Sequence, residues 1–429
     1  MRTTVRTGGL DLAPFRALRY VPERVRELAA VTSPPYDVVV RPEGWNHLHT
    51  SHPYNIVRLI LPQNGNPSPA HRHRSAADTL ARWRRDGVLA PDPTPALYVY
   101  EQRSGGILQR GIIGALRLTP PEKHIVLPHE EVMPEVVTDR AGLMRETAAN
   151  LEPLLLSYHA DADDPDGAAA VIEQTTATPA LLDITTENGF SHRLWAVTDP
   201  DGQRRVRSGL ARCTALIADG HHRWATYLRL AAEHGHAAPW DRGLVLLVDT
   251  TRHPLSVRAI HRVLPRLSPA DALVRLHGAF RTRALGTGDL DQALRTLESA
   301  RPEDGNAFLL AGGGRFHLLD RPDPALLART VPADRPPAWR RLDAAVLHST
   351  LLRTLWQVPE TPSQVEYLHE AEAAVARAEA RGGSAVLLRP VSETTVRSLA
   401  EHGVPMPQKS TSFGPKPATG LLLRSLYDG

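Results

Sequence analysis

Short apolar runs alternate with longer amphipathic stretches along much of the chain, a pattern typical of mixed α/β proteins. The apolar runs predict strands at residues 55–61, 96–101, 111–118, 125–127, 214–218, 243–248 and 385–388, and a buried segment at 154–156. Apolar positions three and four residues apart predict helices at residues 76–86, 140–150, 220–233, 270–277, 290–299, 342–356 and 366–381. We therefore expect an α/β fold in the mixed (α+β) sense.

Turn-forming residues mark the ends of several of these elements. Ser104-Gly105-Gly106 separates two predicted strands and indicates a hairpin. Gly87 and Gly235 follow predicted helices, as glycine often does at a helix end. This pattern divides the chain into an N-terminal mixed α/β region (1–120), a middle α/β module (121–265) and a C-terminal helical or mixed region (266–429).

The composition is that of a globular protein. Of 429 residues, 42% are hydrophobic and 23% are charged, which argues against a disordered chain. The net charge of +3 is too small to indicate a nucleic-acid partner. The single cysteine, Cys213, excludes an internal disulfide and a multi-cysteine metal site. Among 50 basic residues, the lysines are Lys123, Lys409 and Lys416.

The sequence also bears on the compartment of the protein. No apolar stretch approaches the ~20 residues that a membrane-spanning helix needs. The N-terminus contains basic side chains but lacks the apolar core of a signal peptide. Because a single cysteine favours a reducing compartment, we expect a cytoplasmic protein without a membrane partner.

The segment Asp219-Gly220-His221-His222-Arg223-Trp224 joins a predicted strand to a predicted helix. Its first helical turn carries two histidines and an arginine, and cations there oppose the helix dipole. The backbone N–H groups at a helix start also have no partner within the helix. A bound phosphate would suit both features, so the pattern favours an anion site. The alternative is an aspartate that caps the helix, followed by surface side chains.

A second polar segment, Pro128-His129-Glu130-Glu131, follows the short apolar run at 125–127. Repulsion between adjacent carboxylates can raise the pKa of one of them toward the range of a general base. The alternative is a solvated acidic loop.

The two segments together resemble the motif pair of the archaeal free-serine kinases, small enzymes of the ParB/sulfiredoxin-like fold that phosphorylate the amino acid serine. The whole chain also resembles the bacterial and archaeal family called domain of unknown function 1015. Segments that carry this second resemblance lie at residues 33–38, 52–55, 98–102, 139–140, 149–150, 261–263 and 406–411. The resemblance implies a ParB/sulfiredoxin-like catalytic module with an insertion in the middle region, because the two motifs lie further apart than in the small kinases.

The kinase resemblance implies a phosphotransferase that uses ATP or ADP with Mg²⁺ to phosphorylate a small hydroxyl substrate, with free L-serine first. The implied catalytic residues are Glu130 as general base, Asp219 as the residue that orients substrate or Mg²⁺, and His222. By the same resemblance, Gly220, His221 and Arg223 would bind phosphate or nucleotide, and His129 and Trp224 would bind the substrate. The alternative function is a ParB-like nucleotide-binding regulatory protein without phosphate transfer.

Other polar segments carry weaker signals. Lys409 lies in a donor-rich loop (408–420), which is either a structural C-terminal loop or part of the same pocket, where Lys409 would bind phosphate or nucleotide. Gln408 stands where a P-loop requires glycine, so Lys409-Ser410-Thr411 is not a Walker motif. The histidines at 47–52 and 71–73 lack the carboxylate or cysteine partners of a metal site. Cys213 lies outside the 219–225 loop, where a sulfiredoxin-type nucleophile would be needed.

Overall fold

The computed structural model describes residues 8–39, 42–63, 68–160, 167–276, 278–287, 289–300, 305–361 and 363–427. Contacts divide the chain into two compact units. The first unit comprises Met1–Leu255 and Pro415–Gly429, and the second comprises Ser256–Gly414. The C-terminal segment therefore belongs to the first unit, although the second unit precedes it in the sequence. The region boundary that we expected after residue 120 falls inside the first unit.

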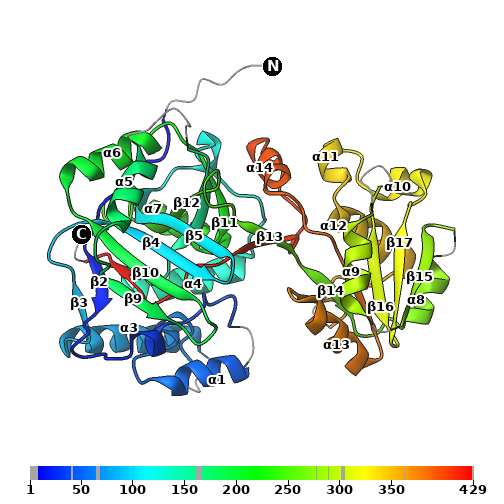
Figure 1. Ribbon diagram of the computed structural model, residues 1–429, viewed down its shortest axis with the longest axis horizontal. Helices are drawn as coiled ribbons and strands as arrows, with labels where there is room; N and C mark the ends of the chain where they lie inside the picture. Colours follow the sequence, from blue (N-terminus) through cyan, green and yellow to red (C-terminus); the bar gives the residue numbers. More distant parts are fainter. Residues whose placement is uncertain are drawn as a thin grey trace. The chain divides into compact units, whose positions relative to one another are not determined.

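The first unit is built on strands with helices packed around them (Figure 1). Its strands are β1 (Leu12–Ala13), β2 (Ala17–Tyr20), β3 (Leu89–Pro91), β4 (Leu97–Ser104), β5 (Ile107–Arg117), β6 (Val126–Leu127), β7 (Ala149–Asn150), β8 (Leu154–Tyr158), β9 (Leu182–Thr185), β10 (Ser191–Val197), β11 (Ala215–Asp219), β12 (Arg242–Asp249) and β21 (Leu423–Ser425). Its helices are η1 (Leu28–Val31), α1 (Pro42–Ser51), α2 (Val57–Ile60), α3 (Pro69–Arg85), η2 (Pro121–Lys123), α4 (Pro134–Thr147), α5 (Ala168–Thr176), α6 (Pro200–Leu210) and α7 (His221–Glu233).

A mixed sheet of nine strands forms the centre of the first unit, in the order β6-β11-β8-β12-β5-β4-β10-β9, with β1 paired to β5. Strand β6 runs parallel to β11, whereas β8 runs antiparallel to β11. Parallel strands end at the same edge of a sheet, and an antiparallel neighbour begins there. The segments after β6 and β11 and the segment before β8 therefore meet at one edge.

The C-terminal segment is held by a second, four-stranded sheet of the first unit, in the order β3-β2-β21-β7. In this sheet β21 pairs antiparallel with both β2 and β7. Strand β21 is thus part of the hydrogen-bonded framework of the first unit.

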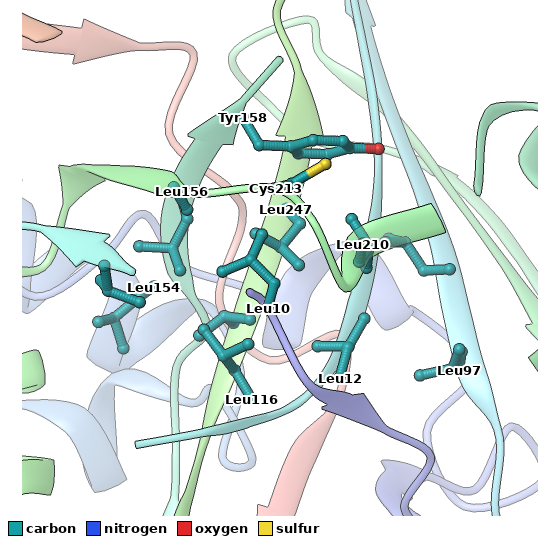
Figure 2. Packing of buried hydrophobic residues seen from close by; sticks show 14 of the residues in the cluster. Leu10, Leu12, Leu97, Leu116, Leu154, Leu156, Tyr158, Leu210, Cys213 and Leu247 are labelled. Carbon is teal, nitrogen blue, oxygen red and sulfur yellow. The ribbon is translucent and has the colours of Figure 1, made fainter. Parts of the chain in front are cut away.

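A large apolar cluster lies between the nine-stranded sheet and its helices. Figure 2 shows part of this cluster, including Leu10 and Leu12 from the N-terminal strand region and Leu154 and Leu156 from β8. Helix α7 contributes one face to the same cluster through Trp224, Tyr227 and Leu230. Helices α5 and α6 pack on each other, and α5 also packs on β4 and β10 (Figure 1).

The second unit contains a six-stranded sheet in the order β15-β17-β16-β19-β14-β18 and a separate pair, β13-β20. Its strands are β13 (Ser256–Ala259), β14 (His261–Leu264), β15 (Arg281–Thr287), β16 (Phe308–Gly312), β17 (Arg315–Asp320), β18 (Glu366–Leu368), β19 (Ser384–Leu387) and β20 (Thr411–Gly414). Its helices are α8 (Pro269–Arg275), α9 (Leu290–Glu298), α10 (Pro324–Thr330), α11 (Pro337–Arg340), α12 (Asp343–Val346), the π-helix η4 (Leu347–Trp356), α13 (Ala371–Arg381) and α14 (Glu393–Glu401).

The predicted mixed α/β class is confirmed, and most predicted elements lie where the pattern placed them. The strand predicted at 55–61 is wrong, because this apolar run contains the short helix α2. Asn55, which is buried, starts that helix: its Oδ1 accepts the N–H of Val57 and its Nδ2 donates to the carbonyl of Thr32. The helix predicted at 366–381 begins as strand β18 and becomes helical only in α13.

Across the described parts of the chain, none of the helices combines the length and the apolar character that a membrane span requires.

Candidate functional site

The two motifs meet at the sheet edge where β6 and β11 end. The backbone N–H of His129 donates to Nε2 of His221 at 3.3 Å. Four residues further on, the N–H of Met133 donates to Nε2 of His222 at 3.0 Å. The start of α7 therefore holds the loop that carries Glu130 at both of its ends.

These two hydrogen bonds determine which nitrogens of the histidines carry a proton. A ring nitrogen that accepts an N–H has no proton of its own, so His221 and His222 accept as neutral imidazoles. The sequence pattern suggested a cationic pair at this position. In the structure, the rings instead position the Pro-His-Glu loop, so their unfavourable charge at a helix start no longer argues for an anion.

His129 lies inside the protein, with 1% of its surface exposed. Its ring meets the ring of His221 edge-on, with centroids 4.4 Å apart. Burial lowers the pKa of His129 to about 3, although a hydrogen bond with the backbone of Ile217 opposes that shift. The ring is therefore neutral at physiological pH. Its protonation in acid is unfavourable because the charged form would be buried away from water.

We expect the free energy of unfolding to fall in acid because of His129. Its pKa is lower in the folded chain than the usual 6.5, so the unfolded chain binds the proton first as the pH falls below 6.5. The stabilisation is complete above that pH and decreases by about 1.4 kcal/mol for each pH unit below it. Denaturant unfolding at several pH values between about 6.5 and 3 should show a slope in wild type that exceeds the slope in His129→Gln by about this amount, because other buried histidines contribute equally to both. His71→Gln, which changes an exposed histidine, is the control; an unchanged slope in His129→Gln would contradict the assignment.

Gly220 is the N-cap residue just before helix α7, and its backbone has a φ of +100°. This left-handed conformation favours glycine, and a Cβ at this position would lie 2.9 Å from Cγ of Leu154. It would also come within 3.1 Å of the guanidinium of Arg223. The glycine thus lets the chain turn tightly from β11 into the helix, which leaves the first N–H groups of α7 at the sheet edge.

Arg223 points into the protein rather than toward an open anion site. Its Nη2 donates to Oδ2 of Asp219 at 2.6 Å, and its Nη1 donates to the carbonyl of Pro153 at 3.0 Å. The side chains of Arg223 and Asp219 are 5% and 7% exposed. Glu152 lies 3.9 Å from the same guanidinium. Arg223 therefore neutralises buried carboxylates at the end of β11 and the start of β8.

A lysine from the C-terminal segment completes this arrangement. Nζ of Lys416 lies 2.5 Å from Oδ1 of Asp219 and 2.6 Å from Oδ2 of Asp37. Asp37 belongs to the Pro-Pro-Tyr-Asp turn near the N-terminus. Charged side chains from four distant segments of the first unit thus meet in one group. We call this group the charge cluster; it consists of Asp37, Glu152, Asp219, Arg223 and Lys416.

Glu152 and Tyr36 connect the cluster to the N-terminal turn. Oε1 of Glu152 accepts the backbone N–H of Tyr36 at 3.0 Å and the hydroxyl of Thr419 at 3.3 Å. Burial raises the pKa of Glu152, and the charge of Arg223 opposes that shift. The guanidinium of Arg223, a member of the cluster, lies over the Tyr36 ring, 5.8 Å from its centroid. The turn is therefore tied to the cluster by hydrogen bonds and by stacking.

The remaining predicted site residues lie in different surroundings. Glu130 is partly buried in the loop between β6 and α4. Trp224 is 3% exposed and belongs to the apolar cluster, so its ring packs in the core and we leave it out of the proposed site. Lys409 is exposed and belongs to the second unit.

Asp219 does not fit a resident Mg²⁺ in this arrangement. One carboxylate oxygen accepts from Arg223 and the other binds Lys416. Mg²⁺ prefers oxygen ligands in a near-octahedral shell, and two adjacent cations oppose its binding. Among the residues that the structure describes, no three or more His, Cys, Asp or Glu side chains are grouped to hold a metal ion.

Sequence reasoning missed Asp37 and Glu152 as members of this site, and within the 408–420 loop it singled out Lys409 rather than Lys416. The scarcity of lysine was a usable signal for Lys416. In an arginine-rich chain, a lysine indicates a position where a compact ammonium fits and the larger guanidinium does not. The rigid Pro-Pro-Tyr-Asp turn was a usable signal for Asp37. Glu152 stands alone before an apolar run, and nothing in the local pattern marks it.

Several solved structures are similar to this chain at low identity. A free serine kinase in complex with AMP is 15% identical and has a TM-score of 0.34, with 67% of this chain and 83% of that chain covered. SbnI with a C-terminal truncation, from Staphylococcus aureus, is 10% identical with a TM-score of 0.36, covering 73% and 87%. A conserved hypothetical protein from Pyrococcus furiosus is 15% identical with a TM-score of 0.33, covering 67% and 87%. Similarities this distant do not assign a function to this chain.

No functionally curated protein matches the chain. A family model does: the one described as "Protein of unknown function (DUF1015)" matches residues 12–345. This match extends from β1 in the first unit to α12 in the second. The chain therefore belongs to the DUF1015 family.

Proposed function

We propose that this protein is a small-molecule kinase that transfers a phosphoryl group from ATP or ADP to the hydroxyl of free L-serine or a related compound. The observation that carries the proposal is the joining of the two motifs at the ends of β6 and β11. Ligands of α/β sheets bind outside the carboxyl ends of the strands, where loops and helix starts come together. The motif pair that resembles the serine kinases meets at such a place.

In the proposed reaction the substrate hydroxyl oxygen attacks the terminal phosphorus of the nucleotide. A new P–O bond forms, the bond to the leaving nucleotide breaks, and the hydroxyl proton goes to the carboxylate of Glu130. His221 and His222 hold the loop of Glu130 by accepting its flanking N–H groups. The N–H groups at the start of α7 and the helix dipole favour the phosphate.

Arg223 has a different role in this proposal from the one that the motif resemblance implied. Its guanidinium is bound to Asp219 and to the carbonyl of Pro153, so it supports the site from the interior. Phosphoryl transfer depends mainly on positioning and on electrostatic stabilisation, and a rigid support contributes to the first of these.

A substrate screen tests the proposal. The purified protein is incubated with ATP, ADP or pyrophosphate and with amino acids and small alcohols, and phosphate transfer is followed by phosphorus NMR. We expect a new phosphomonoester signal with L-serine or a close relative, and none when the acceptor is L-alanine, which lacks the hydroxyl. Nucleotide binding without transfer to any acceptor would contradict the kinase and favour the regulatory alternative.

A further inference from the structure

The position of the Lys416 ammonium is unusual for a lysine. It lies between Oδ2 of Asp37 and Oδ1 of Asp219, at 2.6 and 2.5 Å, and its side chain is 18% exposed. Burial lowers the pKa of a lysine, but the charges of Asp219 and Asp37 outweigh burial here and hold the pKa of Lys416 well above its usual value. Lys416 is therefore a permanent cation at this edge of the sheet.

The segment 415–419 holds this ammonium in place, and we call it the C-terminal strap. Nε2 of Gln109 donates to the carbonyl of Pro415 at 2.9 Å. The hydroxyl of Tyr100 accepts the N–H of Ala418 at 3.2 Å. Both side chains come from buried positions of strands β4 and β5, so a rigid sheet fixes the strap on either side of Lys416.

A second contact ties the strap to the N-terminal turn. The backbones of Thr419 and Ser33 exchange two hydrogen bonds, at 2.8 and 3.0 Å. The strap and the turn that carries Asp37 are thus joined directly. Because the backbone of the strap is already ordered, little conformational entropy remains to be lost when its ammonium binds a partner.

The donor set around Lys416 resembles half of a divalent cation site. Two carboxylate oxygens approach one centre, and they lie within roughly 5 Å of each other because each is a hydrogen-bond length from the same nitrogen. Divalent cations such as Mg²⁺ and Mn²⁺ prefer such carboxylate oxygens. In this chain the ammonium already stands at the centre, and Arg223 occupies the remaining oxygen of Asp219.

We propose that Lys416 is the resident cation of this site, so that Asp37 and Asp219 hold the ammonium in place of a protein-bound divalent metal. The inference extends the proposed function. The binding of the ammonium by the two carboxylates does not depend on the kinase proposal, but its consequence does: the ammonium would supply positive charge near the phosphates of the donor. A metal ion that arrives with the nucleotide is coordinated by phosphate oxygens and is part of the substrate.

Binding of Mn²⁺ alone, without nucleotide, tests the inference. Mn²⁺ is titrated into the full-length protein, and the signal of the free ion is followed by electron paramagnetic resonance. We expect wild type and Asp37→Asn to show the same Mn²⁺ binding, so that no bound Mn²⁺ depends on the carboxylate of Asp37. We expect Lys416→Met to bind it at least about ten-fold more tightly than wild type, because the variant removes a positive charge and leaves two carboxylates facing one another. Lys416→Arg, which keeps the charge, and Lys123→Met, which removes an exposed lysine elsewhere, should behave as wild type does.

Two results would overturn the inference. One is a Mn²⁺ ion bound by wild type and lost in Asp37→Asn. The other is a folded Lys416→Met variant, verified by circular dichroism, that gains no affinity for Mn²⁺. If Lys416→Met does not fold, the comparison of wild type with Asp37→Asn still decides the question. No phosphate donor is present in this experiment, so its outcome is separate from that of the kinase screen.

Discussion

Replacing Glu130 by glutamine should lower turnover by about 10²–10⁴-fold, the range typical of a lost general base. The substitution removes proton acceptance and changes the shape of the side chain very little. Nucleotide affinity should stay within a few-fold, because the proposed contact is with the substrate hydroxyl. Steady-state kinetics with the acceptor found in the screen, together with nucleotide titration by calorimetry, would measure the two effects separately.

The neighbouring carboxylate provides a matched control for this prediction. Glu131 is exposed and follows Glu130 directly, so Glu131→Gln makes the same chemical change one residue away. We expect its turnover to remain close to that of wild type. Equal losses in the two variants, or an unaffected Glu130→Gln enzyme, would remove Glu130 from the reaction.

Replacing Arg223 by alanine should destabilise the fold by about 3–5 kcal/mol, because one partner of a buried ion pair is removed. The guanidinium binds Asp219 and lies 3.9 Å from Glu152, and both carboxylates are almost fully buried. The variant leaves these carboxylates with less compensating charge, and it also leaves the carbonyl of Pro153 without this donor. Denaturant unfolding followed by circular dichroism measures the loss.

An arginine on the same helix serves as the control. Arg229 is 44% exposed and pairs with Glu233 at the surface, so Arg229→Ala should cost less than about 1 kcal/mol. Similar losses in the two variants would contradict the structural role of Arg223. Because the expected effect comes from the interior, weaker nucleotide binding by Arg223→Ala would not by itself indicate a phosphate contact.

Some of the fold could be predicted because it depends on neighbours in the sequence. The β4–β5 hairpin follows from two apolar runs separated by Ser104-Gly105-Gly106. The passage from β11 into α7 follows from an apolar run, a glycine turn and helical periodicity. By contrast, the run at 55–61 is buried as helix α2, and a short apolar run of this kind satisfies a strand or a helix equally well. The tertiary partners of Asn55, including the distant carbonyl of Thr32, fix the start of this helix.

The candidate site divides in the same way. The sequence by itself determined the two motifs and the turn at Gly220, because residue type and local spacing are sufficient for these features. Tertiary structure decided that β6 and β11 pair in parallel and bring the motifs to one edge, and that Arg223 faces inward. It also brought Lys416 from the C-terminal segment to Asp219. These outcomes depend on strand pairing and on ion pairs between charges from distant segments. Such contacts form only after the long loops between the segments have closed, so the local sequence does not predict them.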